Sequence, residues 1–155
     1  MGANVIGIDT GKVKEDFIKS LGAQFVDFAK SPNLVEEIRS ITGGGAHAAT
    51  VASGSPRAFA AAVDMLRIGG TLCCIGIPPG DVYLMTPIAT LIIKGLKVVG
   101  NLVGSMGETL EAVELVRDGT VKPHVEVRRF EELPKVYEML EKGDVLGRIV
   151  LQVAK

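Results

Sequence analysis

The sequence predicts an α/β fold built on a parallel sheet. Over the first two thirds of the chain, short apolar runs of strand length alternate with helical patterns, which is typical of successive β-α-β units. At 155 residues and 47% hydrophobic, the chain is long enough to bury a core. After Gly104 the pattern changes to helix, strand, helix and strand with many charges, which predicts a small α+β segment that caps the sheet.

The expected elements of the sheet are defined by apolar spacing and by their end signals. The expected strands are residues 4–8, 24–27, 48–52, 71–75 and 97–103. The expected helices are residues 14–21, 33–42, 57–66 and 87–94. Ser31 with Pro32 suits the start of the second helix, residues 43–45 suit its end, and Ser55 with Pro56 suits the start of the third.

Two more helices and two more strands are expected after Gly104. The stretch ETLEAVELVRDGTVKP predicts an amphipathic helix that stops at Gly119, and a short strand is expected around residues 125–127. The stretch EELPKVYEMLEKGDVLGRIVLQV predicts a second helix that stops at Gly143 and a final strand.

Charge and hydropathy exclude two classes of partner. The formal net charge is −1, and no run of lysine and arginine is long enough to follow a phosphate backbone, so nucleic acid is not expected. The longest nearly uncharged stretch, residues 82–93, is shorter than the roughly 20 apolar residues that a membrane span needs. No targeting segment is visible at the N-terminus, so no membrane association is expected.

Cysteine and histidine usage indicates no metal site within this sequence. Cys73 and Cys74 are adjacent in an apolar run, and neighbouring residues of a strand point to opposite faces. They are therefore expected to be small buried hydrophobes, and free thiols fit a reducing, cytoplasmic compartment. His47 and His124 lie far apart and have no metal-ligand spacing.

Asp9, which ends the first apolar strand, is the first candidate binding residue. A carboxylate there can accept hydrogen bonds from both hydroxyls of an adenosine ribose, although an aspartate in this place is also often a helix cap or turn residue. Lys14 can lie beside the same sugar or be a solvated charge. Because a carboxylate repels a 2'-phosphate, the pair favours NAD over NADP. The G-x-G-x-x-G turn that precedes such an acid by about 20 residues has no place before Asp9.

Small residues follow three later strands, at residues 52–55 (ASGS), 75–80 (IGIPPG) and 99–105 (VGNLVGS). Open α/β sheets bind ligands at these strand ends, and small residues let a flat ring or a sugar approach the backbone. The alternative is that these glycines only form turns. Arg148 interrupts an apolar strand, where it either faces solvent at an edge or meets an anion. No nucleophile or acid-base set is legible.

These segments, in this order, resemble the carboxyl-terminal half of the zinc-dependent medium-chain alcohol dehydrogenases, especially the tetrameric fungal and bacterial type. The resemblance covers essentially the whole chain and rests on GANVIGIDTGKVKEDFIKSLGAQFVDF, CCIGIPPG, IKGLKVVGNLVGS and LEKGDVLGRIV. The stretches GNLVGS and GDVLGRIV are the most specific. The resemblance implies a Rossmann-like parallel sheet lacking its first strand in residues 1–105, and a return to the catalytic domain in residues 106–155.

The resemblance also implies roles for eight residues around NAD. Asp9 would bind the ribose hydroxyls with Lys14 beside them, and Arg148 would pair with the pyrophosphate. The others would be Ser53 at the adenine end and, on the nicotinamide side, Ile75, Ile77, Asn101 and Val103.

The implied activity is NAD-dependent oxidation of alcohols to aldehydes or ketones, and the reverse, in a homo-oligomer. The zinc ligands, the proton relay and the glycine-rich turn would precede Met1, so this chain alone is expected to be inactive and its sheet to lack the central strand. Three outcomes stay open: the gap closes, another chain fills it, or the sequence is part of a longer protein. The alternative function is a non-catalytic nucleotide-binding or assembly module.

Overall fold

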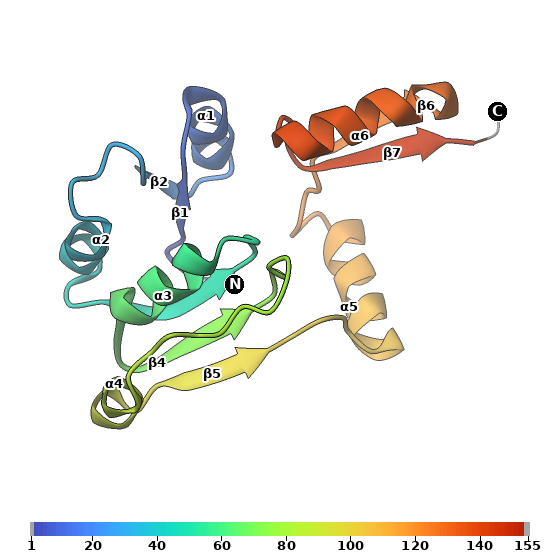
Figure 1. Ribbon diagram of the computed structural model, residues 1–155. Helices are drawn as coiled ribbons and strands as arrows, with labels where there is room; N and C mark the ends of the chain where they lie inside the picture. Colours follow the sequence, from blue (N-terminus) through green and yellow to red (C-terminus); the bar gives the residue numbers. More distant parts are fainter. Residues whose placement is uncertain (1, 154–155) are drawn as a thin grey trace. The chain divides into compact units, whose positions relative to one another are not determined.

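The structure is a computed structural model, and it describes residues 2–153. The chain divides into two compact units. Residues 27–104 form one, which we name the central unit. The residues up to 26 and from 105 onward form the other, which we name the terminal unit. Figure 1 shows the helices and strands of both.

The central unit is built on three parallel strands. Its elements are α2 (Leu34–Thr42), β3 (Ala46–Val51), α3 (Pro56–Met65), β4 (Leu66–Cys74), α4 (Ile88–Lys94) and β5 (Lys97–Gly100). The strand order is β3-β4-β5, and the register joins Thr50 to Cys73 and Cys73 to Val99. The carboxyl ends of all three strands therefore meet at one edge of this sheet.

The core of the central unit lies where α3 packs on β3 and β4. Val63, Leu66 and Leu72 are at most 1% exposed. Val51 and Ala62 complete this buried cluster, and Phe59 and Cys74 pack against it. A parallel sheet needs such a cover, and α3 supplies it with a face of alanines and Val63.

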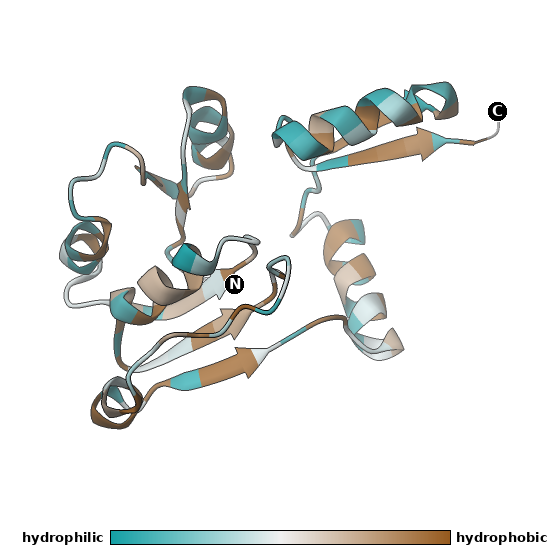
Figure 2. Ribbon diagram, in the orientation of Figure 1, coloured by the Kyte–Doolittle hydropathy of each residue, from teal (hydrophilic) through white to brown (hydrophobic). Residues whose placement is uncertain are grey.

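The terminal unit contains two separate two-stranded sheets. Its elements are β1 (Ile6–Asp9), α1 (Lys12–Ser20), β2 (Gln24–Asp27, whose last residue belongs to the central unit), α5 (Met106–Arg117), β6 (Val125–Arg129), the 3-10 turn η1 (Phe130–Glu132), α6 (Leu133–Lys142) and β7 (Arg148–Gln152). β1 pairs with β2, and β6 pairs in parallel with β7. The rings of Phe17 and His124 meet edge to face with centroids 5.0 Å apart. In Figure 2, β7 carries mainly hydrophobic residues, whereas α6 is largely hydrophilic.

The predicted fold class is confirmed, since the described residues form helices and parallel sheets in the expected order. Among the described residues, β1-β2 and β3-β4-β5 are separate sheets. The division into a cofactor-binding part (1–105) and a catalytic-domain part (106–155) stays a prediction. None of the helices within residues 2–153 is both long and apolar enough to span a bilayer.

Several element boundaries differ from the predicted ones. The cap of helix α2 was predicted at Ser31, with Pro32 in the first turn. The cap is instead Asn33, whose side chain accepts a hydrogen bond from the Glu36 amide at 3.3 Å, and the helix begins at Leu34. Strand β4 begins directly after α3, before the glycine pair at residues 69–70, rather than at residue 71. Strand β5 ends at Gly100 rather than residue 103, so that Asn101 and Val103 lie in the following loop.

Candidate functional site

Asp9 and Lys14 form a direct ion pair at the carboxyl end of β1. Lys14 Nζ lies 2.9 Å from Asp9 Oδ1, and the Thr10 amide donates to the same oxygen at 2.8 Å. Both side chains are partly exposed, at 36% for Lys14 and 39% for Asp9. The N-cap of α1 is Gly11, at φ 97°, so that Asp9 is not the cap of this helix.

The arrangement leaves the second oxygen of the Asp9 carboxylate free to accept hydrogen bonds. Among the described residues, both contacts to the Asp9 side chain go to Oδ1. Lys14 holds the carboxylate in place through that oxygen, and Oδ2 remains for an external donor. A pair of neighbouring sugar hydroxyls is a donor set that suits such a carboxylate.

The second group of predicted residues lies where β3 and β4 end in the central unit. The amides of Ile75 and Gly76 both donate to Val51 O, at 3.0 and 2.8 Å. A Cβ added at Gly76 would overlap the carbonyl of Ser53. The turn after β3 and the turn after β4 are therefore in backbone contact, and only glycine fits at position 76.

This backbone contact continues to the loop after β5. The Asn101 amide donates to Cys74 O at 3.0 Å, which extends the β4-β5 ladder by one residue beyond β5. Ser53 Oγ accepts from the Ser55 amide at 3.0 Å, so its hydroxyl stabilises the turn into α3 and keeps its proton available to donate. Gly76 was not among the site residues predicted from the sequence; the signal for it was the single glycine of the stretch IGI directly after a strand.

Exposed apolar side chains surround these turns. Ile77 is 75% exposed and Val103 is 81% exposed, and Ile75 is also exposed. Beside small residues and exposed backbone, such side chains form a surface that a flat, largely apolar ring can cover. Cys74, one residue before Ile75, packs against the core, and burial, followed by the neighbouring Cys73, raises the pKa of its thiol.

Arg148 lies in the terminal unit, at the start of its last strand. It is the first residue of β7, its amide donates to His124 O at 2.9 Å, and its side chain is exposed. Among residues 2–153 its guanidinium has no ion pair. The chain approaches β7 through Gly147, at φ 75°, where a Cβ would overlap His124. A free guanidinium on a glycine-shaped turn is able to pair with an anion.

Within each unit, contacts link some of the eight predicted residues. Asp9 contacts Lys14, and the Ser53 and Ile75–Ile77 turns adjoin one another with Asn101 alongside. The binding of one cofactor by all eight stays a prediction. A hollow of about 380 Å³ lies at the amino-terminal ends of β1 and β2, beside Val5 and Gln24. Asp9 lies at the other end of β1, so the hollow does not belong to this site. Among the described residues, no three His, Cys, Asp or Glu side chains are grouped so that they could hold a metal ion.

Comparisons with known proteins agree on one family. The family described as zinc-binding dehydrogenase matches residues 1–118. An alcohol dehydrogenase of Schizosaccharomyces pombe is 38% identical over 100% of this chain, which covers 44% of that protein. The crystal structure of the Aeropyrum pernix alcohol dehydrogenase matches with a TM-score of 0.86 and 32% identity, over 97% of this chain and 43% of that one. A structure described as an NAD-dependent alcohol dehydrogenase matches with a TM-score of 0.86 and 29% identity, over 99% of this chain and 45% of that one. The chain thus spans less than half the length of these relatives.

Proposed function

We propose that this chain, which belongs to the zinc-binding dehydrogenase family, supplies the cofactor-binding part of an NAD-dependent alcohol dehydrogenase. The reaction would be oxidation of primary or secondary alcohols to aldehydes or ketones, and the reverse. The observation that carries the proposal is the Asp9 carboxylate at the carboxyl end of β1. Lys14 holds it through one oxygen, and within residues 2–153 the other oxygen has no partner. It is supported by the alcohol dehydrogenases among the relatives.

The Asp9–Lys14 pair would select NAD over NADP. The free oxygen of Asp9 accepts hydrogen bonds from the ribose hydroxyls, whereas a 2'-phosphate in the same place would meet a carboxylate. Lys14 is already paired with Asp9 at 2.9 Å, so its charge is largely satisfied within the chain. Like-charge repulsion at this position therefore decides against the phosphorylated cofactor.

The remaining residues would hold the other parts of the dinucleotide. The free guanidinium of Arg148 would pair with the pyrophosphate, and Ser53 would lie at the adenine end. Ile75, Ile77 and Val103 would cover the nicotinamide ring, with Asn101 beside it. Bound NAD would supply the hydride acceptor, and a zinc ion held by residues outside this chain would polarise the alcohol oxygen.

Assembly and location belong to the same proposal. The stretch from Pro78 to Leu91 carries exposed apolar side chains, such as Tyr83, Met85 and Ile88, and would form a contact between copies in a homo-oligomer. The two free thiols, Cys73 and Cys74, agree with the reducing cytoplasm.

The test is an activity measurement on a fusion protein, which we call the joined protein. Its first part consists of the residues of the Schizosaccharomyces pombe alcohol dehydrogenase that precede the region similar to this chain, and its second part is this chain. Alcohol-dependent formation of NADH, absent from the Schizosaccharomyces pombe part alone, is expected. Asp9→Ala and Arg148→Ala are each expected to weaken NADH binding by about tenfold, because each removes charge-assisted hydrogen bonds. A folded joined protein that binds NADH and oxidises no alcohol would favour the assembly module instead.

A further inference from the structure

Helix α3 ends differently from the other helices of the central unit. Helices α2 and α4 end at glycines in the left-handed conformation, Gly43 at φ 65° and Gly95 at φ 57°. Helix α3 has no such residue, because it runs directly into β4 at Leu66, which is extended at φ −73° and ψ 142°. The last carbonyls of any helix lack partners within the helix. At α3, the cap amide of Leu66 satisfies only the carbonyl of Val63.

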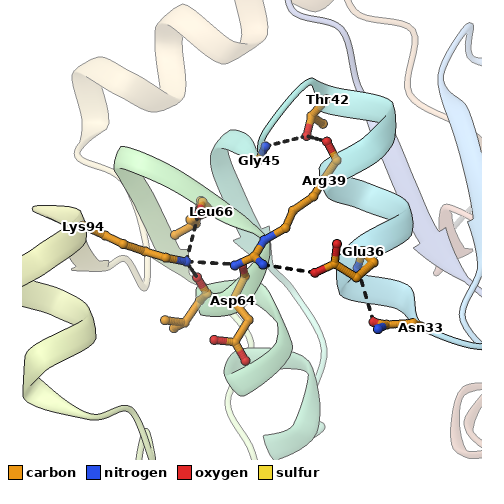
Figure 3. Close-up of polar contacts among 9 residues, drawn as sticks. Asn33, Glu36, Arg39, Thr42, Gly45, Asp64, Leu66 and Lys94 are labelled. Carbon is orange, nitrogen blue, oxygen red and sulfur yellow. Dashed lines mark hydrogen bonds and ion pairs between the residues drawn. The ribbon is translucent and has the colours of Figure 1, made fainter.

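Two cations from neighbouring helices satisfy these carbonyls instead. Lys94 Nζ donates to Leu66 O at 3.1 Å, to Asp64 O at 3.3 Å and to Val63 O at 3.4 Å. Arg39 Nη2 donates to Asp64 O at 2.9 Å. Figure 3 shows both side chains converging on the end of α3 from opposite sides. An ammonium has three protons to donate, so these three carbonyls use all of them.

The position of each cation follows from its own helix. Lys94 is the last residue of α4, so its charge lies near the negative end of α4 as well as that of α3. Arg39 lies in the last turn of α2 and is oriented by Glu36, whose Oε1 is 3.2 Å from Arg39 Nη1. The partners on α3 are main-chain oxygens, and the carboxylate of Asp64 forms no ion pair with either cation.

We propose that Lys94 and Arg39 form a charge-dependent latch that replaces the missing turn cap of α3 and joins α2, α3 and α4 at the start of β4. The latch acts at the point where the core-covering helix becomes the central strand of the sheet, beside the fully buried Leu66 and Leu72. Loss of the charge at Lys94 weakens this junction, because Leu66 O then loses its ammonium donor in a partly buried place and Asp64 O keeps only the donor from Arg39. The proposal does not depend on the bound cofactor.

The test compares variants of the 155-residue chain by residue-resolved amide hydrogen exchange. Lys94→Met keeps most of the aliphatic stem and removes the charge and all donors. Exchange of the amides from 62 to 68 is expected to become at least about tenfold faster, with amides of β1 and α1 unchanged as the internal reference. Lys94→Arg, which keeps charge and donors, is expected to restore most of the protection. Asp64→Asn is the matched control and is expected to change exchange less than about twofold, since only the backbone of Asp64 is used.

Two further measurements test the latch independently. Combining Lys94→Met with Arg39→Met is expected to accelerate exchange by more than the product of the single effects, because either cation alone still supplies a donor to Asp64 O. In the unmodified protein, acetic anhydride is expected to acetylate Lys94 at least about tenfold more slowly than Lys30, which is 77% exposed. Equal acetylation rates, unchanged exchange in Lys94→Met, or an equal effect of Lys94→Arg would each overturn the latch.

Discussion

The two units differ in what holds them together. The central unit has a sheet of three strands covered by α3, and its buried hydrophobic residues are Ile38, Val51, Ala62, Val63, Met65, Leu66 and Leu72. In the part of the terminal unit that the structure describes, only Val26 and Val136 are buried to the same degree. A two-stranded sheet is marginally stable by itself. The central unit is therefore stabilised by its core, and the terminal unit by local contacts.

Helix α5 illustrates how the terminal unit depends on local contacts. Helix α5 has no buried residue, and its apolar side chains Met106, Leu110 and Val113 are all exposed. Its start is fixed by a capping box, in which Ser105 Oγ accepts from the Glu108 amide and the Glu108 carboxylate accepts from the Ser105 amide. Such local signals define a helix without a core, so the terminal unit should respond to changes at caps and the central unit to changes in packing.

The largest effect is expected from Leu72→Ala. Leu72 is 0% exposed on the central strand β4, so its truncation leaves a cavity that costs about 3 kcal/mol of unfolding free energy. The matched control is Leu140→Ala on α6, where the side chain is 54% exposed and a change below about 0.5 kcal/mol is expected. Urea denaturation followed by circular dichroism measures both. Equal losses for the two variants would remove the distinction between the units.

A smaller effect is expected where the two turns of the central unit touch. Gly76→Ala places a methyl group against the Ser53 carbonyl, which should cost about 1–3 kcal/mol and also weaken NADH binding by the joined protein. Gly100→Ala is the control, because nothing lies within 4 Å of a Cβ there. Unfolding free energies and NADH titrations of both variants check this. A Gly76→Ala protein that matches Gly100→Ala in both would show that the contact is not required.

Removal of a helix cap should reveal a further difference in stability between the two units. Ser105→Ala removes the α5 cap and is expected to cost about 1 kcal/mol of helix stability, enough to fray a helix that has no buried residue. Asn33→Ala removes the α2 cap, but the buried Ile38 should keep that helix formed. Backbone chemical shifts of the two helices measure the result. Equal fraying of α2 and α5 would argue against core packing as the difference.

The smallest effect is a pH dependence of α5. The Ser105 amide, followed by the Ser105 side chain, lowers the pKa of Glu108 below its ordinary value of 4.5. Because the folded pKa is the lower one, the stabilisation is fully present above pH 4.5 and is lost as the pH falls through the folded pKa. Chemical shifts of the first turn of α5 should therefore move toward coil values in this acid range. The same titration of Glu108→Gln should show no such step.

Local signals in the sequence predicted most of the fold. Alternating apolar runs gave the order of the strands, and Gly43, Gly119 and Gly143 were read correctly as the residues that follow or end helices. The start of β4 was missed for a physical reason. The α3–β4 junction has no turn residue of its own and is completed by Lys94, whose contact with Leu66 O spans 28 residues of sequence. Such a cap cannot be recognised from neighbouring residues.

The sequence likewise allowed some contacts of the candidate site to be predicted and not others. The contact between Asp9 and Lys14 could be anticipated because five residues span a strand end and the first turn of a helix. The contact between Gly76 and the Ser53 carbonyl depends on the pairing of β3 with β4, which the sequence does not specify residue by residue. For Arg148 the sequence left two alternatives, a solvent-facing arginine at an edge or one that meets an anion. The structure shows an exposed side chain, and the anion stays a prediction.

The most direct test of the proposed function is a competition between NADH and NADPH for the joined protein, measured by equilibrium titration with and without Asp9→Ser. The Asp9 carboxylate predicts tighter binding of NADH, and its removal should shift the ratio of the two dissociation constants toward NADPH. Equal or tighter binding of NADPH by the unmodified joined protein, or a ratio that Asp9→Ser leaves unchanged, would contradict the placement of a ribose at the end of β1.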